Sequence, residues 1–290
     1  MNYIPLNITS ETAQLKTVIL GIGTDQGEPY EINPVAKMHK QQGTYPKPED
    51  IEEEINEAKL ALEKAGVEVL QPDNLKEKKQ IFTRDIGFVI DDRFVIANMK
   101  EPLRQGEIKG IERIMSQFNP EKIVRIPDGA TIEGGDVLVH GNHVFVGISK
   151  RTNRKGFDYL KDQFPNKTFH ALELVVSDDP KVNILHLDCA FQPVGEKYAI
   201  FYEEGFVHKP EIIYDLFGTD NLIRIDQEEK NLMFPNIFSI GPNDVLIEKG
   251  FTRLIAELEA RGITCHKVKY FETSKLSGLL RCSTLPLVRV

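Results

Sequence analysis

A unit of strand, strand, helix and strand recurs along the chain, and this repetition constrains the fold more than any other feature of the sequence. Apolar residues at helical spacing mark each helix, and a short β-type run follows each of them directly. The unit occurs about five times with a period of roughly fifty residues. The expected helices are Pro48–Lys64, Gln105–Gln117, Asn153–Gln163, Lys209–Phe217 and Lys249–Arg261.

Most of these helices are preceded by a predicted hairpin, in which turn residues separate two short β-type runs. The expected hairpins are Ile86–Ile90 with Phe94–Asn98, Val137–His140 with His143–Ile148, Ile184–Phe191 with Tyr198–Tyr202, and Ile237–Ile240 with Val245–Glu248. The runs expected after the helices are Val67–Leu70, Ile123–Ile126, Thr168–Leu174, Leu222–Ile225 and Ile263–Val268.

A hairpin before each helix argues against a doubly wound sheet, in which single strands alternate with helices. Propellers close by radial repetition, but their usual four-stranded blades contain no helix. The pattern therefore favours a five-bladed α/β propeller of ββαβ units, with an open α/β sheet as the alternative. No linker or change of composition divides the chain, so we expect residues 1–290 to form a single domain.

The composition limits the kind of partner. A net charge of -8 disfavours nucleic acid and anionic membranes, and no apolar run reaches the length of a membrane span. The three cysteines show no paired short spacing, so we expect no disulfide framework and no cysteine-rich zinc site. The start of the chain lacks the features of a signal peptide, and the expected compartment is the cytoplasm.

Polar clusters interrupt the apolar runs in four of the repeats, each at a strand end or in a hairpin. In a radial fold the equivalent strand ends converge on the central axis, so residues far apart in sequence would share one site. The clusters are Phe82–Asp85, Ile132–Val137, His186–Cys189 and Leu280–Ser283.

This site would contain a thiol, an imidazole and several carboxylates. A cysteine with a nearby histidine suits nucleophilic catalysis. Several carboxylates would repel the oxyanion of an acyl transfer, but they match the planar donors of a guanidinium. A bound cation would also favour the thiolate form of Cys282. We therefore expect nucleophilic attack on a guanidinium carbon.

The chain resembles the guanidine-modifying amidinotransferase superfamily, which includes arginine deiminases, dimethylarginine dimethylaminohydrolases and glycine amidinotransferases. Five segments match in the order of that family and span most of the chain. The resemblance implies a five-bladed α/β propeller, in agreement with the repeats. The matching segments are Phe82–Asp85, Glu133–Leu138, Val146–Asn153, His186–Asp188 and Arg281–Arg289.

The resemblance implies a role for each residue of the reacting centre. Cys282 would be the nucleophile and His186 the general acid and base. Glu133 would orient His186, while Asp85 and Asp188 would hold the guanidinium. The implied chemistry needs no cofactor and no metal, and the ligand pattern His-Glu-x-x-His is absent from the sequence.

Arg104 and Arg151 follow Asp85 and Glu133 at offsets similar to those of family arginines that bind the substrate α-carboxylate. We expect Arg151 near the rim of the site. The chain is too short for the helical insertion of arginine deiminases and has the length of a dimethylarginine hydrolase. Its loop Ser274–Leu280 lacks the Gly-Arg-rich pattern of the deiminases, so the amino-acid end of the substrate stays open.

Residues near these motifs have simpler structural interpretations. Cys189 and Cys265 are expected to be core residues. His186 and Asp188 are expected on one face of a strand, because side chains two residues apart point the same way. Asp136 is expected to serve a turn.

The sequence thus predicts a cysteine-dependent hydrolase that converts arginine or a methylated arginine to citrulline through a covalent thiouronium. Its expected partner is a small guanidino compound. Two alternatives are an amidinotransferase and a non-catalytic propeller, as in a ribosome-binding translation initiation factor. The joint presence of Cys282, His186, Asp188, Glu133 and Asp85 argues against the second alternative.

Overall fold

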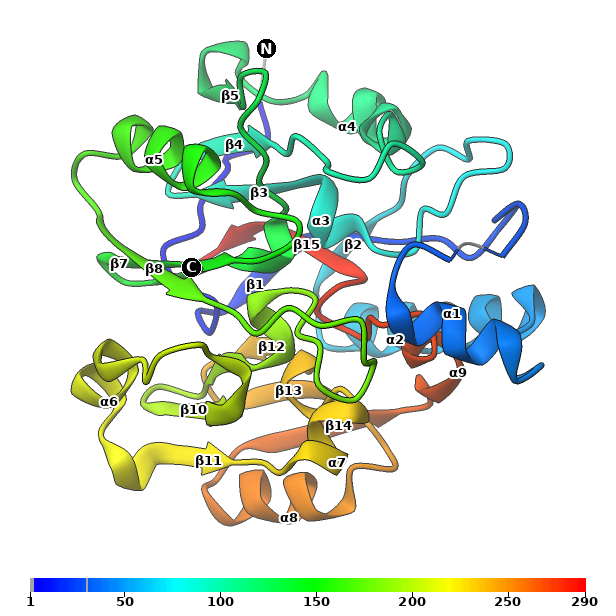
Figure 1. The fold of residues 1–290 in the computed structure, drawn as a ribbon. Coiled ribbons are helices and arrows are strands. Elements are labelled where there is room, and N and C mark those ends of the chain that lie inside the picture. The colour runs from blue at the N-terminus through cyan, green and yellow to red at the C-terminus, as the bar shows by residue number, and fades with distance from the viewer. Residues whose placement is uncertain (1–2, 30) are drawn as a thin grey trace.

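The computed structural model describes residues 3–29 and 31–290, and its strands form five small sheets of three strands each (Figure 1). The sheets have the strand orders β15–β1–β2, β3–β4–β5, β6–β7–β8, β9–β10–β11 and β12–β13–β14. The strands are β1 Leu15–Leu20, β2 Glu68–Leu70, β3 Gly87–Ile90, β4 Arg93–Ile96, β5 Ile123–Arg125, β6 Val137–His140, β7 His143–Ile148, β8 Thr168–Glu173, β9 Phe191–Val194, β10 Tyr198–Phe201, β11 Leu222–Arg224, β12 Phe238–Gly241, β13 Asp244–Glu248, β14 Thr264–Val268 and β15 Thr284–Arg289.

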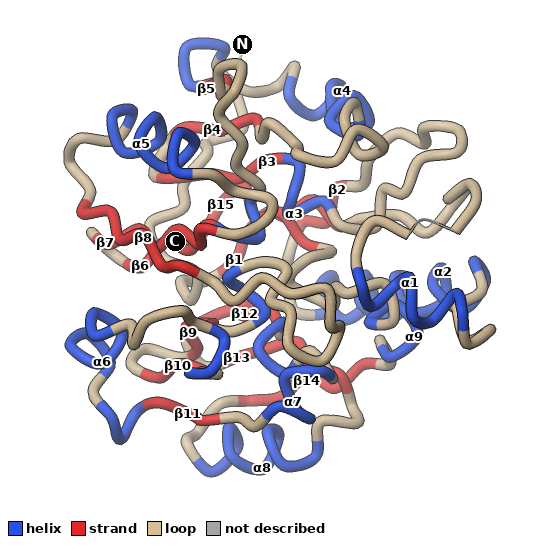
Figure 2. Tube along the Cα trace, in the orientation of Figure 1, coloured by secondary structure: helices blue, strands red, loops and turns tan. Residues whose placement is uncertain are grey.

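Every sheet repeats one pairing pattern. Its first strand is antiparallel to the middle strand, and its third strand is parallel to the middle strand. A parallel pair needs a crossover connection, and a helix supplies it in each unit. These five helices lie at the periphery, around the strands (Figure 2). They are α2 Pro48–Lys64, α4 Glu112–Met115, α5 Arg154–Gln163, α6 Glu211–Phe217 and α8 Thr252–Ala260.

The remaining helices connect the units or begin them. They are α1 Pro34–Gln41, α3 Thr83–Ile86, α7 Gln227–Asn231 and α9 Phe271–Ser274, with the 3₁₀ turns η1 Glu107–Ile111, η2 Pro120–Lys122, η3 Gly134–Asp136, η4 Leu187–Cys189, η5 Glu203–Gly205, η6 Thr219–Asn221 and η7 Phe234–Asn236. None of the helices in the described part of the chain is long and apolar enough to cross a bilayer.

The ring closes through the two ends of the chain. Strand β15, near the C-terminus, pairs antiparallel with β1, near the N-terminus, and β1 pairs parallel with β2. The sheet that contains α2 therefore takes its first strand from the opposite end of the sequence. Contacts of β15 with β3 and of β1 with β12 join this sheet to its two neighbours.

The five-fold α/β architecture predicted from the repeats is confirmed, and α2 has the predicted bounds. The predicted helix Gln105–Gln117 is wrong as a single element, since η1 and α4 divide it. Gly110 lies in the 3₁₀ turn, where a Cβ atom would come within 2.1 Å of the Gln80 side chain. This close packing and the low helix propensity of glycine favour the tighter turn.

The predicted strand Ile184–Phe191 is also wrong. The chain forms η4 there, and β9 starts only at Phe191. The amide of Leu187 donates to the Asp136 carboxylate at 2.9 Å, and the amide of Cys189 donates to the carbonyl of His186. A bond to a residue about fifty positions away thus holds a helical turn where the alternating apolar pattern indicates a strand.

A short helical turn precedes the first strand of each sheet, and these turns meet at the centre of the molecule. Turn α3 leads into β3, η3 into β6, η4 into β9 and η7 into β12, and a turn at residues 280–283 leads into β15. Contacts join α3 with η3, η3 with η4, and η4 with η7. Side chains on these turns therefore share one region, although about fifty residues separate successive turns.

Candidate active site

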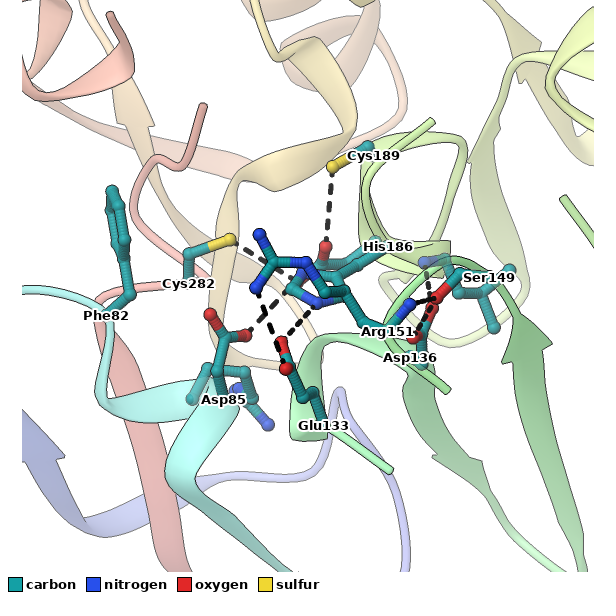
Figure 3. A network of polar contacts seen from close by, with 12 residues as sticks. Phe82, Asp85, Glu133, Asp136, Ser149, Arg151, His186, Cys189 and Cys282 are labelled. Atoms are coloured by element: carbon teal, nitrogen blue, oxygen red, sulfur yellow. Dashed lines mark hydrogen bonds and ion pairs between the residues drawn. The ribbon is translucent and has the colours of Figure 1, made fainter. Parts of the chain in front are cut away.

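The central turns bring the predicted reactive side chains together (Figure 3). Asp85 is in α3, Glu133 directly precedes η3, and His186 directly precedes η4. Cys282 is in the turn before β15, and Asp188 is in η4. All five side chains are buried. The propeller repeat explains the arrangement, because all five residues lie in or directly before the turns that meet at the centre of the molecule.

His186 and Glu133 form a buried hydrogen-bonded pair. Nε2 of His186 lies 2.9 Å from Oε2 of Glu133, and Nδ1 lies 3.6 Å from Oδ1 of Asp85. Burial alone would lower the pKa of His186, but the charges of Asp85 and Asp136 and the Glu133 hydrogen bond outweigh it and raise this pKa. Burial alone would raise the pKa of Glu133, but His186 outweighs it and lowers this pKa. The pair is therefore an imidazolium beside a carboxylate near neutral pH.

Gly135 permits this close arrangement. A Cβ atom at this position would lie 2.7 Å from Nδ1 of His186 and 2.9 Å from Oδ1 of Asp85. Distances below 3 Å require a neighbour to shift. Only a residue without a side chain leaves His186 and Asp85 in place.

The thiol of Cys282 has two polar neighbours. Its Sγ lies 3.7 Å from Oδ2 of Asp188 and 3.2 Å from Nδ2 of Asn236. Burial raises the pKa of Cys282 well above its ordinary value, and the charges of Asp188 and Asp85 raise it further. The thiol is therefore protonated near neutral pH in the structure described.

Asp188 is itself held by a buried cation. Nη1 of Arg281 donates to Oδ2 of Asp188 at 2.8 Å, and Nη2 donates to Oε1 of Glu11 at 3.1 Å. Both carboxylates contribute to a raised pKa of Arg281, against the effect of burial. Residues from the two ends of the chain thus fix the carboxylate beside the thiol.

Asp85 also has a cationic partner. Nη1 of Arg104 donates to its Oδ2 at 2.6 Å, while Nη2 and Nε of Arg104 bind Glu107. The other oxygen of Asp85, Oδ1, is buried and accepts no hydrogen bond from the described residues. One oxygen of Asp85 can therefore accept a further N–H donor.

Arg151 lies deeper than the rim position expected from the sequence. It is only 2% exposed, and its Nη1 lies 3.7 Å from Oε1 of Glu133. Its Nη2 donates to the carbonyl of Ile32 at 3.0 Å, and its Nε lies 3.8 Å from Glu101. The turn formed by Ser149 around Asp136 carries Arg151 inward, because the Ser149 hydroxyl donates to Asp136 and accepts from the Arg151 amide.

A small cavity adjoins these groups. It has a volume of about 40 Å³ and is lined by Asp85, Arg104 and Arg151 together with apolar residues that include Ile81 and Phe82. Residues 32, 33 and 36, at the start of α1, line its other side. Such a volume holds only a few water molecules.

The side chains of Asp85, Glu133 and His186 place one ligand atom each within 4.8 Å of one another. Oxygen and imidazole ligands of this kind can bind a divalent cation. Here Glu133 already bonds to His186, and the guanidinium of Arg104 pairs with Asp85. The donor set suits a planar cation with N–H groups better than a metal ion.

Asn236 also lies at this centre and was not predicted from the sequence. This residue ends η7 and occupies in its unit the place that Asp85 and Cys282 occupy in theirs. The repeat could have pointed to Asn236, because the sequence predicted a central polar cluster in four units and none in the fifth.

The expectation that His186 and Asp188 share a strand face is wrong, because neither lies in a strand. Asp136 joins η3 to η4 rather than serving only a local turn.

This fold and this set of buried groups define a class, the guanidino-modifying enzymes of the pentein, or amidinotransferase, superfamily. A family model described as N,N dimethylarginine dimethylhydrolase, eukaryotic, matches residues 31–288. The chain therefore belongs to the dimethylarginine dimethylaminohydrolase family.

Two bacterial relatives are similar to most of the chain. The uncharacterised protein YkgA of Bacillus subtilis is 34% identical over 235 residues, which cover 79% of this chain and 77% of YkgA. The dimethylarginine dimethylaminohydrolase of Pseudomonas aeruginosa is 27% identical, over 78% of this chain and 84% of its own.

A solved structure shows the same fold at low sequence identity. The amidinotransferase SxtG of Microseira wollei, from the saxitoxin biosynthetic pathway, has a TM-score of 0.82 at 18% identity. The match covers 99% of this chain and 98% of SxtG. The similarity supports the propeller architecture.

Proposed function

We propose that this protein is a cysteine-dependent hydrolase that converts arginine or a methylated arginine to citrulline and ammonia or an amine. One observation carries the proposal: the Cys282 thiol lies 3.7 Å from the Asp188 carboxylate, and the His186–Glu133 pair lies beside Asp85, whose charge acts on the same thiol. Thiol, imidazole and carboxylates at a buried centre are the groups that substitution at a guanidinium carbon requires.

Substrate binding would activate the nucleophile. Asp188 and Asp85 contribute to the raised pKa of Cys282 through their negative charge, after burial. A guanidinium held by these two carboxylates cancels that charge and brings a cation close to the sulfur. The pKa of Cys282 then falls, and the thiol proton leaves to solvent.

In the first step the Cys282 thiolate forms a C–S bond to the guanidinium carbon. The bond from this carbon to one nitrogen then breaks, and the His186 imidazolium protonates the departing nitrogen. The products of this step are ammonia or an amine, a cationic thiouronium on Cys282, and a neutral His186. Glu133 holds the imidazole in position throughout.

In the second step neutral His186 takes a proton from water, and the hydroxide adds to the thiouronium carbon. The C–S bond breaks, the thiolate of Cys282 returns, and the added hydroxyl releases its proton to solvent. The carbon leaves as the ureido group of citrulline, and His186 is again an imidazolium.

Arg151 is proposed to bind the substrate carboxylate, since it lines the cavity beside Asp85. Arg104 lines the same cavity, but its donors are already bonded to Asp85 and Glu107, so we propose that it holds Asp85 in position instead. The cavity of about 40 Å³ is too small for arginine. We therefore expect the start of α1 to move away when substrate enters. This movement would break the hydrogen bond between Arg151 and the carbonyl of Ile32, so that the Arg151 guanidinium could bind the substrate carboxylate.

Amidino transfer is a second candidate, because the same groups serve an acceptor amine in place of water. The amidinotransferase neighbour with the same fold motivates this alternative. It predicts the same thiouronium but a different second step.

A screen of guanidino compounds tests both proposals. Purified protein is incubated with arginine, methylated arginines and agmatine, with and without glycine, and ureido product and released amine are measured. Citrulline with ammonia or methylamine supports hydrolysis. Ornithine with an amidinated glycine supports transfer, and the absence of turnover of every compound by a folded protein contradicts both.

A further inference from the structure

A second, larger cavity lies on the other side of α1 from the candidate active site. Its volume is about 260 Å³, and residues of α1, α7, α9 and the loop 175–186 line it. Figure 1 shows α1 and α9 in the same region of the molecule. Apolar side chains cover much of its wall, among them Val35 and Met38 from α1, Leu232 and Met233 after α7, and Phe271 in α9.

The charged groups of this cavity have one sign. Among the described residues, Lys181, Lys230 and Lys275 line it and no aspartate or glutamate does, although Glu272 outside the lining pairs with Lys275 at 2.7 Å. The whole chain carries a net charge of -8. Lys181 and Lys230 therefore give the described lining of this cavity an excess of positive charge, in contrast to the chain as a whole, and it favours an anionic occupant.

Lys230 is a buried lysine in the lining of this cavity. Its side chain is only 3% exposed, and its Nζ donates to the carbonyls of Lys181 at 2.8 Å and Asn183 at 3.4 Å. Among the described residues Lys230 forms no ion pair with a carboxylate within 4 Å, and Asp179 acts on its ammonium only from farther away. Burial of a cation without a paired anion is costly, and here it lowers the pKa of Lys230.

We propose that the second cavity binds a small amphipathic anion. Its carboxylate or phosphate pairs with the ammonium of Lys230, and its apolar body packs against Met38 and Phe271. The volume of about 260 Å³ accommodates a compact ring system with one anionic group. The anion supplies the countercharge that the protein does not place beside Lys230.

The second cavity adjoins the candidate active site through Cys189 and through two residues that line both cavities. Cys189 lines the cavity, and its Sγ lies 3.7 Å from Oδ1 of Asp188, whose other oxygen faces Cys282. Leu185 and Ser277 line both cavities. An anion bound there sits next to the groups proposed for catalysis, but the proposal concerns binding and stands apart from the reaction.

Isothermal titration calorimetry of the full chain tests the proposal with three probes that share one apolar body. They are naphthoate, naphthyl phosphate and the neutral naphthamide. At least one anion is expected to bind with a stoichiometry of one, and naphthamide is expected to bind at least about tenfold more weakly, because it lacks the group that meets Lys230. The preferred anion distinguishes a carboxylate from a phosphate ligand.

Variants locate the binding site. Lys230→Met is expected to weaken anion binding about tenfold or more, while Lys230→Arg retains most of it and Lys64→Met, at an exposed lysine of α2, changes nothing. If Lys230→Met does not fold, Met38→Trp fills the cavity from α1 and should abolish binding of all three probes. Equal affinity for the neutral probe, or unchanged binding in both Lys230→Met and Met38→Trp, would overturn the proposal.

Discussion

Asn236 and Cys282 are joined by two hydrogen bonds that fix the thiol relative to its own backbone. Oδ1 of Asn236 accepts from the amide of Cys282 at 3.1 Å, and Nδ2 donates to Sγ of Cys282 at 3.2 Å. The same Oδ1 accepts from the amide of Leu279 at 3.0 Å. One amide side chain thus holds the turn before β15 and the sulfur that this turn presents.

Replacing Asn236 should reduce turnover more than it reduces stability. Asn236→Ala removes a donor that would stabilise the thiolate, and a hydrogen bond to a charged group contributes about 1.5–3 kcal/mol. We expect kcat to fall roughly ten- to a hundredfold. The control is Asn243→Ala, in the exposed turn between β12 and β13 of the same unit. Equal kcat in the two variants would contradict a role for Asn236 at the thiol.

Serine substitutions of the three cysteines should have very different effects on turnover. Cys282→Ser is expected to reduce turnover at least about a thousandfold, because the nucleophile is lost. Cys265→Ser, at a half-buried position, should retain most of the activity. Cys189→Ser should do the same, although its sulfur contacts Asp188. Similar losses in all three variants, measured beside their thermal unfolding, would indicate a general effect on stability.

The charge of His186 predicts a pH dependence of stability. The folded-state pKa of His186 lies above its ordinary value of 6.5. Its contribution to the free energy of unfolding is therefore fully present below pH 6.5 and is lost as the pH rises through the folded-state pKa. The difference in unfolding free energy between the native chain and His186→Asn should therefore shrink as pH increases above neutrality. Urea titrations at several pH values measure it, and a difference that grows with pH would contradict the imidazolium.

The close packing around Gly135 predicts that adding one methyl group there lowers kcat strongly. Gly135→Ala places a Cβ atom within 3 Å of His186 and Asp85, so these side chains must shift. A shift of about 1 Å at a catalytic group can cost roughly a hundredfold in rate. Gly250→Ala is the matched control, since its Cβ would meet no atom closer than 3.4 Å. Normal kcat in Gly135→Ala would show that His186 and Asp85 tolerate displacement.

Arg151 predicts how the substrate's carboxylate is recognised. Arg151→Ala should raise KM for arginine and cost roughly ten- to a hundredfold in kcat/KM, because a charge-assisted contact contributes about 1.5–3 kcal/mol. Agmatine has no carboxylate, so its kcat/KM should fall much less. Lys150→Ala, at the exposed neighbouring residue, serves as the control. Equal losses for arginine and agmatine would assign Arg151 to the support of Glu133 alone.

The sequence alone determined the architecture, because it is periodic. Each unit contains its own apolar pattern and turn residues, so the helix Pro48–Lys64 and the hairpin Val137–His140 with His143–Ile148 form with the predicted bounds. Local signals of this kind report local structure. The same periodicity places the polar residue of each unit near the axis, which is why Asp85, Glu133 and His186 could be expected to meet.

Only the tertiary structure decided the features that depend on distant partners. The turn η4 replaces a predicted strand because the Asp136 carboxylate accepts from the amide of Leu187. Asn236 gains its role from a hydrogen bond to a sulfur 46 residues away, and the pairing of β15 with β1 joins the two ends of the chain. Sequence patterns describe which faces are apolar, but hydrogen bonds between units fix these side chains, and such bonds exist only once the units have packed together.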